Sequence, residues 1–119
     1  MPHLTLDYTE NLGAFDAGSA LHALNQALAA SGQFEEADIK SRAQRLDVYA
    51  IGTAPTGRAF IHARLAVLSG RNAEVKRELS ERMLAVLRAA TAGRHPGMEL
   101  QLCAEIQEID RASYAKATL

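Results

Sequence analysis

The sequence predicts an α/β (α+β) fold in which a tandem βαβ repeat forms a four-stranded sheet with two helices on one face. Apolar residues follow the period of a strand, then of a helix, then of a strand, in both halves of the chain. Turn chemistry at residues 53–57, with Pro55 and nearby glycines, separates the two halves. Right-handed crossovers are much the commoner connection between parallel strands, so both helices are expected on the same face of the sheet.

The first repeat is expected to begin almost at the first residue. Leu4, Leu6 and Tyr8 alternate with polar residues, which is typical of a strand with one covered face. In the next segment, from about residue 14 to residue 31, leucines recur at helical spacing through alanine-rich sequence. Gly32 stands where a left-handed helix terminus is expected. A strand followed by one long helix is therefore predicted.

The second strand is expected over residues 39–51, and its apolar residues change parity along the way. Ile39 has an odd number, whereas Leu46 and the apolar positions after it have even numbers. Because side chains alternate strictly between the two faces of a strand, one extra residue would be needed to put all of them on one face. We therefore predict a bulge near residues 44 and 45.

The second half repeats this order. Residues 59–68 read as a nearly continuous apolar strand, and residues 72–90 carry apolar side chains at helical spacing. Gly93 and Pro96 are expected to end the helix, and the last strand is predicted at about residues 98–109. Two long helices can cover only one face of the resulting sheet, so self-association is expected to bury the other face.

Length and composition indicate one domain over residues 1–119 and exclude several classes of protein. Hydrophobic residues make up 48% of the chain, enough for one core, and the net charge of −1 gives no sign of binding to nucleic acid. The single cysteine, Cys103, excludes an internal disulfide and fits a reducing compartment. No apolar run approaches the ~20 residues of a membrane helix, and the start does not resemble a secretory signal. A cytoplasmic protein without membrane contact is expected, whose partner is a small molecule or another protein.

Pro2 is the first candidate for chemistry. A small second residue generally permits removal of Met1, which would leave a secondary amine at the beginning of a strand. Burial disfavours the cation of such an amine, so its pKa is expected below the ordinary ~7.7 to 8.0. Pro2 would then be a neutral base at physiological pH, whereas in most chains that start Met-Pro the proline only stiffens the backbone.

A base that removes a proton beside a carbonyl needs cations or backbone donors to stabilise the negative charge that develops. Two short segments offer cations at predicted element ends, where loops converge. Lys40 and Arg42 open the second strand, and Arg71 lies between the third strand and the second helix. His62, in contrast, lies within a predicted buried strand and is expected to be a hydrogen-bonded structural residue.

These residues occur in the order and spacing of a known family over nearly the whole chain. The chain resembles the tautomerase superfamily, and within it the 5-carboxymethyl-2-hydroxymuconate isomerase family. The segments that carry the resemblance are the Met-Pro-His start, Ala-Ser-Gly-Gln-Phe at residues 30–34, Ile-Lys-Ser-Arg at 39–42, Ala-Phe-Ile-His at 59–62 and Gly-Arg at 70–71.

The resemblance implies a homotrimeric isomerase of aromatic compound catabolism that uses neither cofactor nor metal. Pro2 corresponds to the family's general acid/base, and Arg71 to the arginine that binds the substrate carboxylate. Lys40 departs from the pattern, because the related isomerases carry arginine there, and lysine lacks the planar fork that holds a carboxylate with two bonds. Arg42, expected on the same side of the strand, is a candidate to replace it, although an ion pair in solvent or between subunits is an equal alternative.

Three functions therefore compete. The first is isomerisation of a 5-carboxymethyl-2-hydroxymuconate-like acid by proton transfer through Pro2. The second is a proline-based tautomerase or hydratase acting on a different unsaturated acid, which Lys40 favours. The third is a non-catalytic trimeric assembly, in which Pro2 is only the first residue of a strand. Retention of Met1 would favour the third, because an acylated proline nitrogen is not basic.

Overall fold

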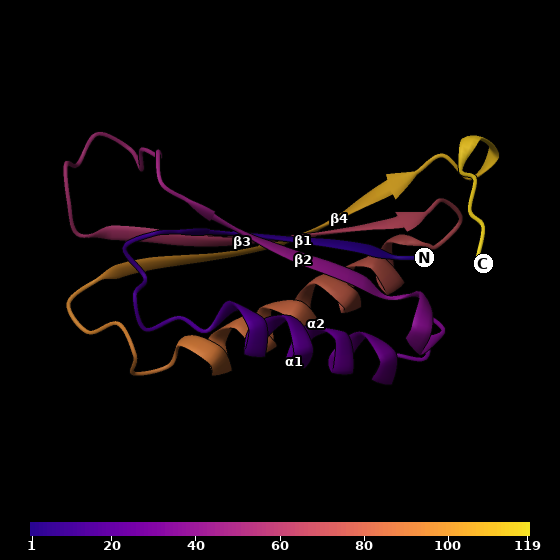
Figure 1. Cartoon of the computed structure of the whole chain (residues 1–119), viewed down its shortest axis with the longest axis horizontal. Helices are drawn as coiled ribbons and strands as arrows, with labels where there is room; N and C mark the ends of the chain where they lie inside the picture. The colour runs from indigo at the N-terminus through magenta and orange to yellow at the C-terminus, as the bar shows by residue number, and fades with distance from the viewer.

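The computed structural model describes the whole chain, residues 1–119, as one sheet backed by two helices. Strand order across the sheet is β2-β1-β3-β4. Figure 1 shows the two helices side by side beneath the sheet, with both chain ends at the same end of the molecule. The elements are β1 (His3–Thr9), α1 (Ala17–Ala30), β2 (Lys40–Leu46), β3 (Arg58–Leu68), α2 (Ala73–Thr91) and β4 (Glu99–Ile109), with short 3-10 helices η1 (Glu36–Asp38) and η2 (Arg111–Ser113).

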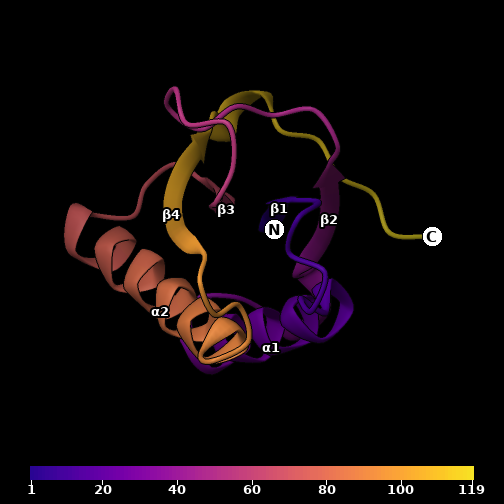
Figure 2. The same ribbon diagram turned by 90° about the vertical axis from the view of Figure 1, so that its left-hand side faces the viewer.

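Strand pairing confirms the predicted repeat. Strand β1 pairs in parallel with β2, and β3 pairs in parallel with β4, so each helix connects two adjacent parallel strands. The two halves join where β1 and β3 run antiparallel at the centre of the sheet. In the view of Figure 2, both helices lie on one side of the sheet, as the sequence predicts.

Each helix begins at a side-chain cap. The Asp16 carboxylate accepts a hydrogen bond from the Ser19 amide at 3.1 Å, and the Asn72 side chain accepts one from the Val75 amide at 2.9 Å. Such caps satisfy amides that have no partner within the helix. At the other end of α1, Gly32 has φ of 77°, the left-handed conformation that the sequence predicts and that glycine adopts without strain.

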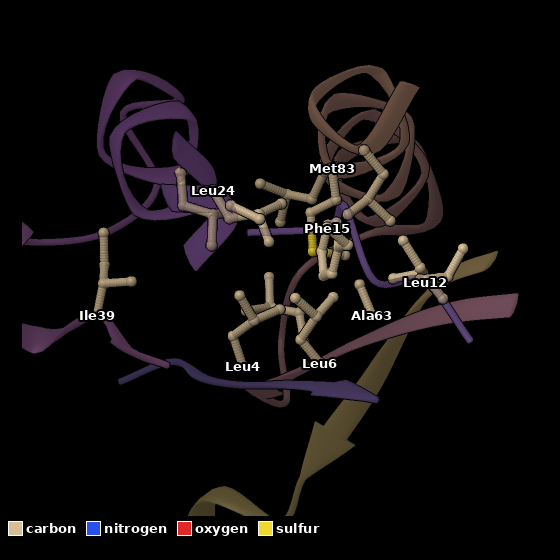
Figure 3. Close-up of a cluster of buried hydrophobic side chains, with 14 of the residues drawn as sticks. Leu4, Leu6, Leu12, Phe15, Leu24, Ile39, Ala63 and Met83 are labelled. Carbon is tan, nitrogen blue, oxygen red and sulfur yellow. The ribbon is translucent and has the colours of Figure 1, made fainter. Parts of the chain in front are cut away.

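The core lies between the helices and one face of the sheet. Side chains from β1, β3 and both helices meet there and exclude water, as Figure 3 shows. Leu4 and Leu6 of β1, Leu24 of α1 and Met83 of α2 have no exposed surface. Burial of a side chain of this size stabilises the fold by about 2 kcal/mol, so these contacts fix β1 firmly against the helices.

The second strand differs from the prediction. It ends at Leu46 instead of residue 51, and its pairing with β1 runs from Lys40 to Leu46 without an extra residue. The predicted bulge near residues 44 and 45 is therefore wrong. Strand β2 is an edge strand with a largely exposed surface, so its apolar residues need not share a face, and Val48 is 95% exposed in the loop that follows.

The face of the sheet opposite the helices is mainly polar. Register pairs place the side chains of Thr5, Arg42, Arg64 and Glu105 in one row across all four strands. Within this single chain no helix covers that face, as Figure 2 shows. The polar face is defined here by this row and by the residues that alternate onto the same side of the four strands, namely His3, Asp7, Lys40, Gln44, Phe60, His62, Ala66, Gln101, Cys103 and Gln107.

Candidate active site

A cavity of about 430 Å³ opens at the amino terminus, at the end of the sheet where β1 and β2 begin and β3 and β4 finish. Its wall comes from four separate parts of the chain. These are the amino terminus, the loop after α1, the end of β3 and the segment after η2. The residues that line the cavity are Met1, Gly32, Gln33, Phe34, Glu35, Asp38, Leu68, Tyr114 and Lys116.

The terminal amine lies within this cavity and is partly shielded from water. Met1 has a side chain only 8% exposed, and its nitrogen lies 3.5 Å from Oδ2 of Asp38. Burial lowers the pKa of this amine below its ordinary value of 8.0, and the nearby charge of Asp38 partly opposes that effect. Lys40 and Lys116 lower the pKa further. The cavity therefore favours the neutral form of an amine at this place.

Pro2 is buried directly behind Met1, at the start of β1. Its carbonyl oxygen accepts a hydrogen bond from the amide of Lys40 at 3.1 Å. The next residues, His3 and Lys40, then open the regular pairing of β1 with β2. The position of Pro2 is thus fixed by backbone contacts that do not involve its nitrogen.

Arg71 lies next to the cavity, behind the wall that Gln33 and Phe34 form. Its guanidinium donates to the Gln33 side chain at 3.2 Å, to the Gln33 carbonyl at 2.9 Å and to the Leu68 carbonyl at 3.4 Å. The same group lies 4.8 Å from the centre of the Phe34 ring. Burial and the charge of Arg111 lower the pKa of Arg71, which still leaves it charged at neutral pH.

Lys40 and Arg42 lie on β2 beside the amino terminus, outside the set of residues that line the cavity. The ammonium of Lys40 donates a hydrogen bond to the backbone oxygen of Asp38 at 2.8 Å. Arg42 lies farther along the strand, in register with Thr5 on the polar face. Both cations act on His3, whose pKa is lowered first by burial and then by these two charges.

Asp38, Tyr114 and Lys116 line the cavity, although no pattern in the sequence marks them as site residues. Lys116 donates to Oδ1 of Asp38 at 2.5 Å, and the Tyr114 hydroxyl lies 3.0 Å from Nε2 of His3. Nothing in the local sequence around residues 114–116 indicates a site, because these residues approach the amino terminus only through the fold. Asp38 lies two residues before Lys40, at the start of the predicted second strand. This position beside a candidate site residue is the one feature of the sequence that could have identified Asp38.

His62 lies outside the cavity, as expected for a structural residue. Its Nε2 atom is 3.0 Å from a carboxylate oxygen of Glu105 on the polar face. No group of three or more His, Cys, Asp or Glu side chains lies close enough to hold a metal ion. Neither helix combines the length and the apolar composition that crossing a membrane requires.

A second cavity of about 430 Å³ lies at the opposite end of the sheet, between the loops that precede β3 and β4. The charged or hydroxyl-bearing side chains that line it are Glu10, Tyr49, Thr56 and Arg58. Arg58 is occupied there by bonds to Glu99 and to the Ile51 carbonyl. Because no amine with a lowered pKa is found in that cavity, the cavity at the amino terminus is the candidate active site.

The chain is similar to known proteins over almost its whole length. Residues 2–119 match the family model of 5-carboxymethyl-2-hydroxymuconate isomerase. A 5-carboxymethyl-2-hydroxymuconate Delta-isomerase of Escherichia coli is 26% identical over 110 residues, which are 92% of this chain and 87% of that protein.

Solved structures give the same result. The crystal structure of a 5-carboxymethyl-2-hydroxymuconate isomerase from Deinococcus radiodurans R1 is 38% identical, with a TM-score of 0.89 over 99% of this chain and 90% of that one. A fused 4-OT wild-type symmetric trimer is 17% identical with a TM-score of 0.72, over 97% of this chain and 91% of that one, and shows the shared tautomerase-type fold alone. The protein is therefore an isomerase that belongs to the 5-carboxymethyl-2-hydroxymuconate isomerase family.

Proposed function

We propose that this isomerase moves a proton within an unsaturated 2-hydroxy or 2-oxo carboxylic acid such as 5-carboxymethyl-2-hydroxymuconate, with Pro2 as general acid and base. The reaction would be a step in the breakdown of aromatic compounds. One observation carries the proposal. The terminal amine, which in the unprocessed chain is that of Met1, lies at a cavity of about 430 Å³, where burial lowers its pKa. A neutral amine in contact with a substrate-sized cavity is what proton abstraction requires.

Removal of Met1 would free the Pro2 nitrogen as a secondary amine, behind the place in the cavity wall that Met1 now occupies. Its lone pair accepts a proton from the substrate's enol oxygen or from a carbon beside the carbonyl, which leaves a delocalised oxyanion. The resulting ammonium then returns that proton to a different carbon of the conjugated chain. The proton count of the substrate is unchanged, and neither oxidant nor cofactor is consumed. Pro2 ends the cycle as the neutral amine with which it began.

Negative charge on the substrate needs cations close to the base. Arg71 is proposed to bind a substrate carboxylate, because its guanidinium is held rigidly beside the Phe34 wall of the cavity. Lys40 and Arg42 add positive potential at the start of β2 and are proposed to stabilise the oxyanion. Cations that are already held in place lower the activation barrier of the proton transfer, because they do not have to reorient during the reaction.

A different unsaturated acid is the second candidate, in a tautomerase or hydratase reaction through the same proline. The specific observation is the geometry of Lys40. Its ammonium is bonded to the Asp38 carbonyl and presents a single point of charge rather than a planar fork. An acid with one carboxylate would need less from this position than a diacid.

Self-association as a homotrimer is also proposed. The polar face of the sheet is uncovered in one chain, and the fold is similar to that of a symmetric trimer. Sedimentation equilibrium at micromolar concentration should give three times the 12.8 kDa mass of the chain. Arg64→Glu, which adds a carboxylate beside Glu105 on the polar face, should weaken the assembly. Arg77→Glu, on the exposed side of α2, is the matched control. A monomer at every concentration would contradict the trimer.

The proposed chemistry is tested by the ultraviolet change of 5-carboxymethyl-2-hydroxymuconate, or of 2-hydroxymuconate, on mixing with protein shown by mass spectrometry to begin at Pro2. Rapid isomerisation is expected, and Pro2→Ala processed to the same length should fold normally and lose most of it. Full activity in Pro2→Ala would remove Pro2 from the mechanism. Activity only on other enol acids would select the second candidate. No activity of the Pro2 form on any of these acids would favour a non-catalytic assembly.

A further inference from the structure

The carboxylate of Asp38 lies between two cationic groups at the candidate active site. Its Oδ2 atom is 3.5 Å from the terminal nitrogen, and its Oδ1 atom accepts a hydrogen bond from Lys116 at 2.5 Å. The hydrogen bond from Lys116 is also the main reason why the pKa of Asp38 is lowered. Asp38 is therefore ionised, and Lys116 occupies one of its two oxygens.

The segment that carries Lys116 is fixed at several points along its path from β4. The Arg111 amide and side chain donate to Ser69, at 3.3 Å to the hydroxyl and 3.0 Å to the carbonyl. Tyr114 then contacts His3 through its hydroxyl and its ring, with ring centres 6.0 Å apart. These contacts hold the segment against the beginning of β1, and Figure 1 shows both ends of the chain at the same end of the molecule. Lys116 is thus held beside Asp38 by the fold.

A carboxylate this close to the amine acts against the proposed chemistry. An opposite charge within ~4 to 6 Å favours the protonated amine, which cannot accept a proton from substrate. Removal of Met1 moves the amine by one residue along β1, to Pro2, which is bonded to the amide of Lys40 two residues after Asp38. Because the Pro2 nitrogen is bonded to Met1, whose own nitrogen is 3.5 Å from Asp38, we expect the base to lie within reach of the charge of Asp38.

We propose that Lys116 is a positioning residue of the active site, which pairs with Asp38 and so prevents this carboxylate from holding the Pro2 amine in its protonated form. The inference rests on the proposed role of Pro2 as the base. Lys116 acts on the amine through its pairing with Asp38 and also through its own charge, and it has no direct role toward the substrate in this arrangement. Its positive charge offsets the negative charge of Asp38, so that the groups around the amine carry a net positive charge and favour its neutral form.

Other charged groups surround the amine and stay in place when Lys116 is changed. Lys40 disfavours the protonated amine as Lys116 does, whereas Asp38 favours it. Asp38 and Lys116 are 34% and 35% exposed, so water and salt weaken their interaction without abolishing it. The titratable and charged groups on the elements packed around the amine are His3, Glu35, Asp38, Lys40, Arg42, Arg71, Tyr114 and Lys116.

The experiment measures the protonation of Pro2 directly and does not depend on any substrate. The full chain, processed to begin at Pro2, is labelled with ¹³C-proline and titrated by NMR. Among its three prolines only Pro2 carries a free amine, so one set of signals shifts with pH. Lys116→Met should raise the pKa of this amine relative to the unmodified chain, and Asp38→Asn should lower it. The effect of Lys116→Met should be smaller in the Asp38→Asn background.

Two controls separate the charge of Lys116 from general damage. Lys116→Arg keeps the charge and should leave the titration unchanged. Lys76 is the one lysine that lies away from the amino terminus, and it is paired with Glu108. Lys76→Met should therefore also leave the Pro2 titration unchanged. In the active enzyme, Lys116→Met should reduce kcat/KM about threefold on the acidic side of the pH profile and leave its alkaline plateau unaltered.

An unchanged pKa of the Pro2 amine in Lys116→Met would overturn the inference. It would also be overturned if Lys116→Met raised this pKa equally in the unmodified chain and in the Asp38→Asn background. The outcomes also separate it from the proposed function. If Pro2→Ala abolishes isomerisation while Lys116→Met leaves the titration unmoved, only the role of Lys116 fails. If the titrations shift as expected while Pro2→Ala retains full activity, the pairing with Asp38 stands and Pro2 is not the base.

Discussion

The amide of Lys40 donates a hydrogen bond to the carbonyl oxygen of Pro2 at 3.1 Å, and this bond ties the start of β2 to the start of β1. It uses the carbonyl and does not involve the proline nitrogen, which is bonded to Met1. The residue beside it, Met1, fills part of the cavity wall. Removal of Met1 would thus expose the nitrogen and enlarge the cavity while the strand stays in register.

The first prediction concerns Met1 itself. A chain that retains Met1 should not isomerise the substrate, because its proline nitrogen is an amide with no basic lone pair. Treatment of that same sample with methionine aminopeptidase should restore activity in proportion to the fraction that begins at Pro2, as measured by mass spectrometry. A chain with Met1 intact and full activity would show that the base lies elsewhere.

Arg71→Ala should mainly raise KM. Loss of a partly buried charge that binds a carboxylate is expected to reduce binding by about 2 kcal/mol, roughly 30-fold. Arg71→Lys should recover little, because lysine cannot replace the bonds to Gln33 and Leu68 together with the contact to Phe34. Steady-state kinetics on a diacid and on a monoacid measures the effect. Arg88→Ala, on the exposed side of α2, is the control, and an unaltered KM in Arg71→Ala would contradict carboxylate binding at this residue.

His3 should titrate below the ordinary value of 6.5, because burial and the charges of Lys40 and Arg42 lower its pKa. Between the folded pKa and 6.5 the unfolded chain binds more protons at this histidine. The contribution of His3 to stability is therefore fully present above 6.5 and is lost as the pH falls through the folded pKa.

NMR titration of the four histidine rings, with His3→Gln to assign the signal, measures this pKa. Lys40→Met should raise the pKa of His3 toward 6.5, since one of the positive charges that lower it is removed. Arg88→Met should not change it. A His3 pKa at or above 6.5 in the unmodified chain would contradict the buried, positive surrounding described here.

Asn72→Ala should destabilise α2 without disabling the site. The Asn72 side chain caps the helix through the Val75 amide, and loss of such a cap costs about 1 kcal/mol. We expect the melting temperature to fall by about 4 °C at fixed protein concentration. KM should change little, because Arg71 is held by Gln33 and Leu68 independently of the cap. Asn72→Asp keeps the cap and should melt like the unmodified chain, whereas an equal loss in both variants would contradict the capping role.

Much of the fold could be predicted from the sequence because its patterns are local. The alternation of Leu4 and Leu6 and the leucine spacing of α1 reflect burial against one core, and both follow directly from the period of each element. Strand β2 was predicted less well. An edge strand makes few core contacts, so the parity of Leu46 and Val48 carries no information about a bulge.

The site could be predicted only where its residues belong to the start of the chain or to the ends of elements. Pro2 is a candidate because removal of Met1 would leave it with a free amine. Arg71 is a candidate because it lies between a predicted strand and a predicted helix. Lys116 has no such local feature, since it meets Asp38 across 78 residues of sequence and only after β4 has joined the sheet. Interactions of that kind depend on topology, which no short pattern contains.

The amino terminus and the segment that carries Tyr114 and Lys116 line the same cavity, and this decides how the protein can be labelled. A tag fused before Pro2 would acylate its nitrogen and fill the space now occupied by Met1. A tag after Leu119 would be separated from Lys116 by only three residues and would pull on the segment that lines the cavity. The turn at residues 52–57, at the opposite end of the sheet, is largely exposed. A fluorophore or affinity peptide inserted there would leave the amino terminus free for its chemistry.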